Sequence, residues 1–108
     1  MPELKKNPTL SDFQNYIKQV GIERGWNKNN QLEIFLLFSE EIGELAKAIR
    51  NKMGLYTEKN KKIKEFELED EFADVFNYLI DLANIMNVDL EAAIRRKEEI
   101  NAKRDWTN

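Results

Sequence analysis

The chain contains no cysteine and no histidine among its 108 residues. Without cysteine it can form neither disulfides nor thiolate metal sites. Without histidine it lacks the commonest general base and the usual ligand of zinc, copper and haem iron, and Ser-His-Asp and Cys-His catalytic arrangements are excluded. A metal site in this chain must therefore be built from oxygen ligands, which favours magnesium, manganese or calcium.

Glycine and proline are also scarce, with four and two residues, which is too few for a turn-rich all-β fold. No apolar run approaches the roughly 20 residues that span a bilayer, and the first residues do not have the pattern of a secretory signal. We therefore expect a helical, cytoplasmic protein that has no membrane partner.

The charge balance is slightly acidic, with 17 lysines and arginines against 20 acidic residues and a net charge of -3. Binding to duplex nucleic acid requires many phosphate contacts, so this composition argues against a duplex partner. The length matches the roughly 100–150 residues of one typical domain. We expect a single domain over residues 1–108, of which residues 1–9 are loosely ordered.

Apolar periodicity and capping residues predict four helices, over about residues 11–24, 31–51, 66–86 and 90–104. Three of the starts carry capping signals, namely the pairs Ser11–Gln14 and Asn30–Glu33 and the single residue Asp89. A lysine-rich segment, residues 51–65, is expected to form an exposed loop. The pattern predicts an all-α fold with a four-helix-bundle-like core of antiparallel helices.

The third expected helix is apolar over much of its circumference. Its main stripe consists of Leu68, Phe72, Val75, Phe76, Leu79, Leu82, Ala83 and Met86. Tyr78, Ile80 and Ile85 lie outside this stripe. Such a helix needs more partners than a four-helix monomer supplies, so we expect a symmetric homo-oligomer, either a dimer or a tetramer.

Two pairs of carboxylates interrupt the apolar patterning. Glu41 occupies the stripe of the second helix, and Glu44 follows three residues later, so both side chains point the same way. Glu71 and Asp74 repeat this spacing on the third helix, and Tyr78 continues their row. If these helices pack antiparallel, the four carboxylates converge.

Converging carboxylates need protons or a cation to neutralise them. Two like charges roughly 4 Å apart repel by about 4 kcal/mol at an effective dielectric constant of about 20. Magnesium suits this chain, because it takes a few carboxylates, keeps waters and accepts further oxygens from substrate phosphates. A ferritin-like di-iron centre would require Glu-x-x-His pairs, which a chain without histidine does not contain. The alternative is that the carboxylates are ordinary acidic residues on solvated helix faces.

The order of the motifs along the chain resembles that of a known protein family. Glu40-Glu41-x-x-Glu44, followed after 26 residues by Glu71-x-x-Asp74, resembles the MazG-like all-α nucleoside triphosphate pyrophosphohydrolases. Further segments look like the same family over about residues 10–106, namely Arg24-Gly25-Trp26, the run from Asp74 to Leu90, and the positions Lys97, Asn101 and Arg104.

The resemblance implies hydrolysis of (deoxy)nucleoside triphosphates to a nucleoside monophosphate and pyrophosphate, a reaction suited to nucleotide-pool housecleaning. It implies that Mg²⁺, with Mn²⁺ as a substitute, is bound by Glu41, Glu44, Glu71 and Asp74. Glu40, Glu41 and Glu44 are the candidates that take a proton from water. The candidate substrate-binding residues are Lys97, Asn101, Arg104, Trp26 and Tyr78.

Two other functions fit the same sequence. A phosphoribosyl-ATP pyrophosphatase would share the metal site and differ in substrate. A non-catalytic helical interaction module would carry the four carboxylates as surface charges, and magnesium would leave its stability unchanged. Residues 27–30 differ from the acidic or histidine residues that are common in the family, so the preferred base stays open.

Overall fold

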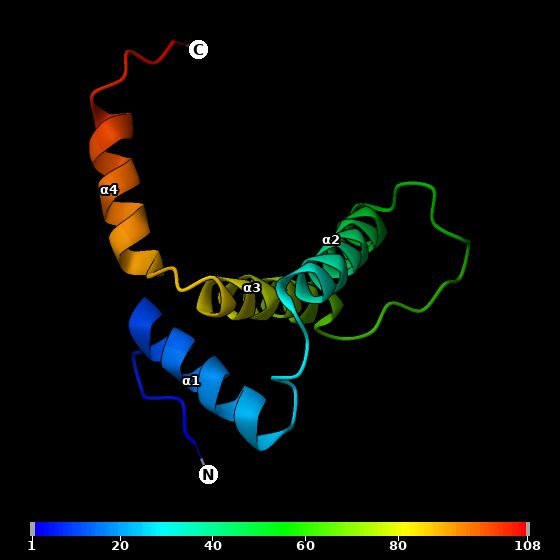
Figure 1. Ribbon diagram of the computed structural model, residues 1–108. Coiled ribbons are helices and arrows are strands. Elements are labelled where there is room, and N and C mark those ends of the chain that lie inside the picture. Colours follow the sequence, from blue (N-terminus) through cyan, green and yellow to red (C-terminus); the bar gives the residue numbers. More distant parts are fainter. Residues whose placement is uncertain (1, 108) are drawn as a thin grey trace.

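The computed structural model describes residues 2–107, and four helices with no strand form its regular structure in this range, which confirms the predicted all-α class. The helices are α1 (Leu10–Glu23), α2 (Gln31–Met53), α3 (Glu67–Ile85) and α4 (Leu90–Ala102). As Figure 1 shows, α2 packs on α3 and α1 lies against α3, whereas α4 turns away and contacts α1. None of these helices is both long and apolar enough to cross a membrane.

Local sequence signals place the helix ends. Asn30 and Glu33 each accept a hydrogen bond from the other's backbone N–H at 2.9 Å, which confirms the predicted capping box of α2. Asp89 caps α4 as predicted, through a hydrogen bond of 3.1 Å from the backbone N–H three residues later. Gly25 and Gly54 take φ angles of 72° and 71°, and this left-handed conformation ends α1 and α2.

The capping box predicted from Ser11 and Gln14 is wrong. Helix α1 begins one residue earlier than expected, and Thr9 and Asp12 form its box with hydrogen bonds of 2.9 and 3.1 Å. Gln14 lies inside the helix, where its side chain faces the turn between α3 and α4.

Gln14 holds that turn against α1. Its Nε2 donates to Asn84 Oδ1 at 3.0 Å and to the Val88 carbonyl at 2.9 Å. Its Oε1 accepts a hydrogen bond from the Leu90 backbone N–H at 3.0 Å. Because every polar atom of the Gln14 amide is engaged, the direction in which α4 leaves α3 is set from α1.

The buried core of the single chain is small. Its largely buried apolar side chains are Val20, Ile34, Ala48, Ile80 and Ala83. Ile80 is fully buried although it lies outside the predicted stripe of α3, whereas Phe72 in that stripe is 54% exposed. Ala83 of the predicted stripe is also buried, so the stripe coincides only in part with the face of α3 that α1 and α2 cover.

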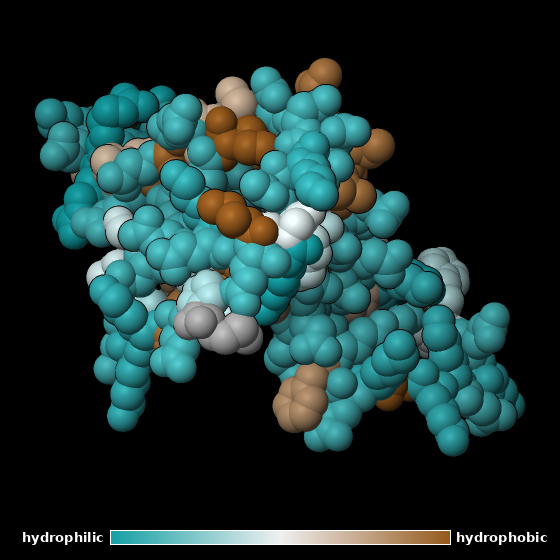
Figure 2. Space-filling model, turned by 60° about the horizontal axis from the view of Figure 1, so that its bottom comes forward, coloured by the Kyte–Doolittle hydropathy of each residue, from teal (hydrophilic) through white to brown (hydrophobic). Residues whose placement is uncertain are grey.

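The chain is more open than a packed domain of its length. Its radius of gyration is 17.1 Å, whereas a compact chain of this size has about 13 Å. The four-helix core expected from the sequence is present only in part. Helix α4 packs on α1 and makes at most isolated contacts with α2 or α3. Figure 2 shows apolar side chains at the surface among hydrophilic ones. The exposed large apolar side chains of the chain include Leu32, Phe35, Leu36, Phe72, Leu79 and Ile94.

Candidate functional site

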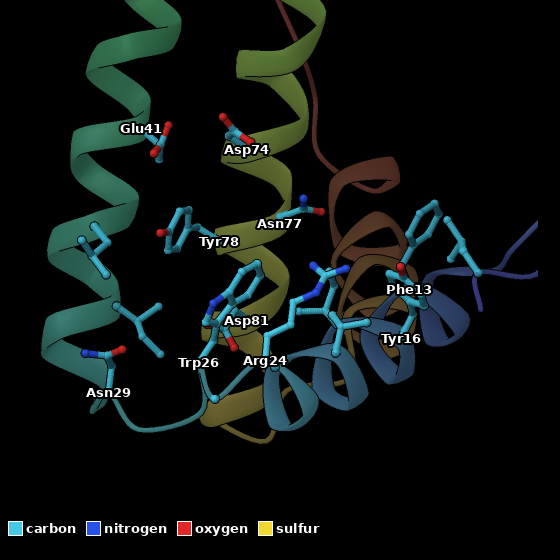
Figure 3. Close-up of a pocket in the computed structure, with 17 residues that line it drawn as sticks. Phe13, Tyr16, Arg24, Trp26, Asn29, Glu41, Asp74, Asn77, Tyr78 and Asp81 are labelled. Atoms are coloured by element: carbon cyan, nitrogen blue, oxygen red, sulfur yellow. The ribbon is translucent and has the colours of Figure 1, made fainter. Parts of the chain in front are cut away.

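Three of the predicted carboxylates meet between α2 and α3. Glu41, Glu71 and Asp74 each offer one carboxylate oxygen, and these oxygens all lie within 4.8 Å of one another. Asn51 Nδ2 on α2 also donates to Glu67 Oε1 on α3 at 3.3 Å, so the two helices run antiparallel. Figure 3 shows the Glu41 and Asp74 side chains opposite each other on the two helices.

Burial and mutual repulsion both disfavour negative charge in this cluster. Burial first, and then the charges of Asp74 and Glu71, raise the pKa of Glu41. Burial, followed by the charges of Asp74 and Glu44, raises the pKa of Glu71. Both shifts have the direction expected of carboxylates that lack a neutralising partner.

The cluster fits a divalent cation that prefers oxygen. Glu71 Oε2 is buried and has no hydrogen-bond partner within residues 2–107. A buried acceptor without a partner is costly to keep, and a cation between the three carboxylates would satisfy it. The donor set consists of carboxylate oxygens alone, which are the ligands of hard ions such as Mg²⁺ and Mn²⁺.

A cavity of about 650 Å³ extends from this cluster between α1, α2 and α3. Its volume falls within the roughly 300–1,000 Å³ of typical small-molecule sites. Glu41 and Asp74 line it near the cluster, and Tyr78 lies one turn beyond Asp74 (Figure 3). Burial, together with the charges of Glu41 and Asp74, raises the pKa of Tyr78, so its hydroxyl keeps its proton at neutral pH.

The other end of the cavity is aromatic. Trp26, in the linker before α2, lines it and is 60% exposed. The Arg24 guanidinium lies 4.9 Å from the centre of the Trp26 ring, which is cation–π distance. Phe13 and Tyr16 of α1 also line the cavity, and Figure 3 shows them apart from Trp26. The arrangement presents a flat aromatic surface in reach of solvent.

Sequence reasoning missed several polar residues of the cavity. Asn77 and Asp81 on α3 line it, as does Asn29 in the linker before α2. Asp74, Tyr78 and Asp81 follow at four- and three-residue steps, so they form one polar row along α3. That periodicity could have pointed to Asp81 from the sequence.

Of the other residues predicted for the site, some lie near the three carboxylates and others lie outside the cavity. Glu44 and Glu40 are close enough for their charges to raise the pKa of Glu41, although neither belongs to the group of three. Lys97 and Asn101 on α4, and Arg104 just after it, do not line the cavity of their own chain. The Asn101 carbonyl accepts a hydrogen bond of 2.7 Å from Trp106 Nε1.

Known proteins share this arrangement of helices and sequence. The family model described as the MazG nucleotide pyrophosphohydrolase domain matches residues 29–105. Human dCTP pyrophosphatase 1 is 33% identical over 100 residues, which are 90% of this chain and 59% of that protein. The mouse dCTP pyrophosphatase 1 is 31% identical over 102 residues, with the same two coverages of 90% and 59%. The chain thus spans less than two thirds of the length of these relatives.

A bacterial protein matches in both sequence and structure. YpjD of Bacillus subtilis is 35% identical over 81 residues, which are 70% of each protein. The crystal structure of YPJD from Bacillus subtilis superimposes with a TM-score of 0.75 at 25% identity, over 88% of this chain and 96% of that one. The helical architecture is therefore shared along nearly the whole chain.

Proposed function

Because this chain belongs to the family of MazG nucleotide pyrophosphohydrolases, we propose that it hydrolyses (deoxy)nucleoside triphosphates to a nucleoside monophosphate and pyrophosphate with Mg²⁺. The observation that carries the proposal is the cluster of Glu41, Glu71 and Asp74 at one end of a cavity large enough for a nucleoside. The names of the dCTP pyrophosphatase relatives point to the same type of reaction.

The three clustered carboxylates would hold the cation, with Glu44 as the further ligand suggested by its position. When bound, Mg²⁺ supplies positive charge that neutralises the phosphoryl oxygens in the transition state. The raised pKa of Glu71 supports this role, because a cation would remove the repulsion that opposes its ionisation.

The reaction is an in-line displacement at the α-phosphorus. A water oxygen attacks this phosphorus, and the bond between it and the oxygen that bridges to the β-phosphate breaks. Pyrophosphate leaves with the electron pair of that bond, and a carboxylate takes the proton of the water. Glu40, Glu41 and Glu44 are the candidates for that base, because this chain has no histidine.

The substrate would lie along the cavity. The Tyr78 hydroxyl, which keeps its proton, can donate a hydrogen bond beside the cluster. The Trp26 ring offers its face to the base, since base–aromatic stacking tolerates every base. In this pose the sugar would lie between Tyr78 and Trp26, which both line the cavity.

Lys97, Asn101 and Arg104 would reach the phosphates from a second copy of the chain. Helix α4 projects from the group formed by α1, α2 and α3. The positive charges of Lys97 and Arg104 are opposite in sign to the charges of the carboxylate cluster. A pair of chains, or a pair of such dimers, would also cover exposed apolar side chains, among them Phe72 on α3 and Ile94 on α4. Burial of apolar surface contributes about 25 cal/mol per Å², so even a modest interface favours this association.

Light scattering at micromolar concentration tests the assembly. We expect at least twice the 12.8 kDa of one chain. Ile94→Glu should shift the protein toward monomer and lower its activity, because it places a charge on the uncovered face of α4. Glu98→Gln, on the same helix, is the control and should keep both mass and activity. A monomeric wild type with full activity would contradict the second copy's role.

Product analysis tests the reaction itself. The protein is incubated with Mg²⁺ and a panel of ribo- and deoxynucleoside triphosphates that includes phosphoribosyl-ATP. We expect pyrophosphate and a nucleoside monophosphate from at least one triphosphate. A nucleoside diphosphate with orthophosphate would overturn the proposal, as would a complete lack of turnover. Turnover of phosphoribosyl-ATP alone would replace it with the phosphoribosyl-ATP pyrophosphatase activity.

A further inference from the structure

One carboxylate lies at the aromatic end of the cavity. Asp81 is on α3, two turns beyond Asp74, and lines the cavity together with Trp26 and Asn77. Within residues 2–107 its carboxylate takes part in no ion pair and no side-chain hydrogen bond. The nearby cation Arg24 is stacked on the Trp26 ring. Figure 3 shows Asp81 behind the indole, away from Glu41 and Asp74.

The spacing along α3 suits a nucleotide. Asp74 and Asp81 are seven residues apart, which corresponds to about 10 Å along a helix that rises about 1.5 Å per residue. This matches the reach of a nucleotide from its α-phosphate to the far edge of its base. With the phosphate at the carboxylate cluster and the base on Trp26, the edge of the base comes to Asp81.

A carboxylate at that edge distinguishes amino from oxo groups. An ionised carboxylate accepts hydrogen bonds and donates none, so it pairs with an exocyclic amino group. An oxo group at the same position is itself an acceptor. The carboxylate and the oxo group then face each other without a hydrogen between them, and both lack a partner, which is costly in a partly buried site. Burial also raises the pKa of Asp81, so its charge is poorly solvated and gains from an N–H donor.

We propose that Asp81 makes the cavity select nucleotides whose base carries an exocyclic amino group, such as cytosine, over those that carry an oxo group there, such as uracil. The inference rests on the proposed pyrophosphohydrolase function and adds to it the feature of the base that is recognised. Asp81 is then a specificity-determining residue, and the three clustered carboxylates are indifferent to the base.

The matched substrates dCTP and dUTP test the selection, since they differ in the amino or oxo group and in the protonation of the neighbouring ring nitrogen. We expect the wild type to have a higher kcat/KM for dCTP, by about tenfold or more. Asp81→Asn should reduce this ratio by about tenfold, because the amide can turn its N–H₂ toward an oxo group. Asp105→Asn, which lies outside the cavity, is the matched control and should keep the ratio of the wild type.

Binding of the monophosphates dCMP and dUMP separates selection from chemistry. We expect dCMP to inhibit or bind more tightly in the wild type and the difference to shrink in Asp81→Asn. Equal ratios in the wild type and Asp81→Asn, or a wild type that prefers uracil, would overturn the role of Asp81 while leaving pyrophosphate release intact. A wild type that binds dCMP over dUMP but releases no pyrophosphate would overturn the proposed function and retain the selection.

Discussion

The cavity between α1, α2 and α3 has two ends of opposite character. At one end, three carboxylate oxygens lie within 4.8 Å of one another, and burial and mutual repulsion raise the pKa values of Glu41 and Glu71. At the other end, Trp26 and a single carboxylate, Asp81, form the wall, and burial alone raises the pKa of Asp81. Concentrated negative charge favours a cation, whereas one carboxylate beside an aromatic face suits a neutral base. In the proposed function, chemistry and base selection would thus be separated by two turns of one helix.

Removing one charge from the carboxylate end should have the largest effect on turnover. Glu71→Gln keeps the shape of the side chain but takes a ligand charge from the cluster, so we expect kcat/KM to fall by about a hundredfold or more. Without metal, the variant should unfold at the same temperature as the wild type or higher, because the repulsion is relieved. Steady-state kinetics and thermal melting measure both, and Glu69→Gln on the exposed side of α3 is the control.

Truncating the aromatic end should have a smaller effect of a different kind. Trp26→Ala removes the stacking surface but leaves the carboxylates in place, so we expect KM to rise by about tenfold while kcat changes little. Trp106→Ala, which removes a tryptophan outside the cavity, should leave both constants near those of the wild type. If Trp26→Ala instead lowered kcat as severely as Glu71→Gln, the two ends would not be separate in function.

The smallest effect concerns the stability of the metal-free protein. Burial raises the pKa of Asp81 in the folded chain. The stability that the Asp81 carboxyl group contributes is therefore fully present below the pKa of an unfolded aspartate, and it is lost as pH rises through the pKa of Asp81 in the folded chain. Asp81→Asn should therefore melt slightly higher than the wild type at neutral pH, and this gain should vanish in acid. Melting curves across the pH range measure it, with Asp105→Asn as the reference. A gain that is equal at every pH would mean that the charge is not its cause.

Local signals in the sequence predict the helices well. The four expected spans differ from the observed bounds by two residues or fewer, because the capping box at Asn30 and the cap at Asp89 depend on neighbours along the chain. The box at Ser11 failed because Thr9 and Asp12, a pair with the same spacing, cap the helix two residues earlier. The Gln14 side chain bonds to groups more than sixty residues away, and local spacing carries no information about them.

The carboxylate end could also be predicted, and the aromatic end only in part. Glu41 interrupts an apolar stripe, and Glu71 and Asp74 repeat its spacing, so the pattern itself pointed to their convergence. Asp81 gave a weaker signal, because it extends the row of Asp74 and Tyr78 along α3, but one aspartate on a helix is common and its role depends on what packs opposite it. The buried position of Ile80 was missed for the same reason, because the face of α3 that meets α1 and α2 is fixed by tertiary packing.

Calorimetric titration of Mg²⁺ into the wild type and Glu71→Gln tests the central claim most directly, that the three clustered carboxylates are one cation site. We predict saturable binding by the wild type and an affinity lower by about tenfold or more in Glu71→Gln, with Glu69→Gln binding like the wild type. A melting scan of the same samples confirms that all three are folded. The same Mg²⁺ affinity in folded Glu71→Gln, or no Mg²⁺ binding by the wild type, would contradict the claim.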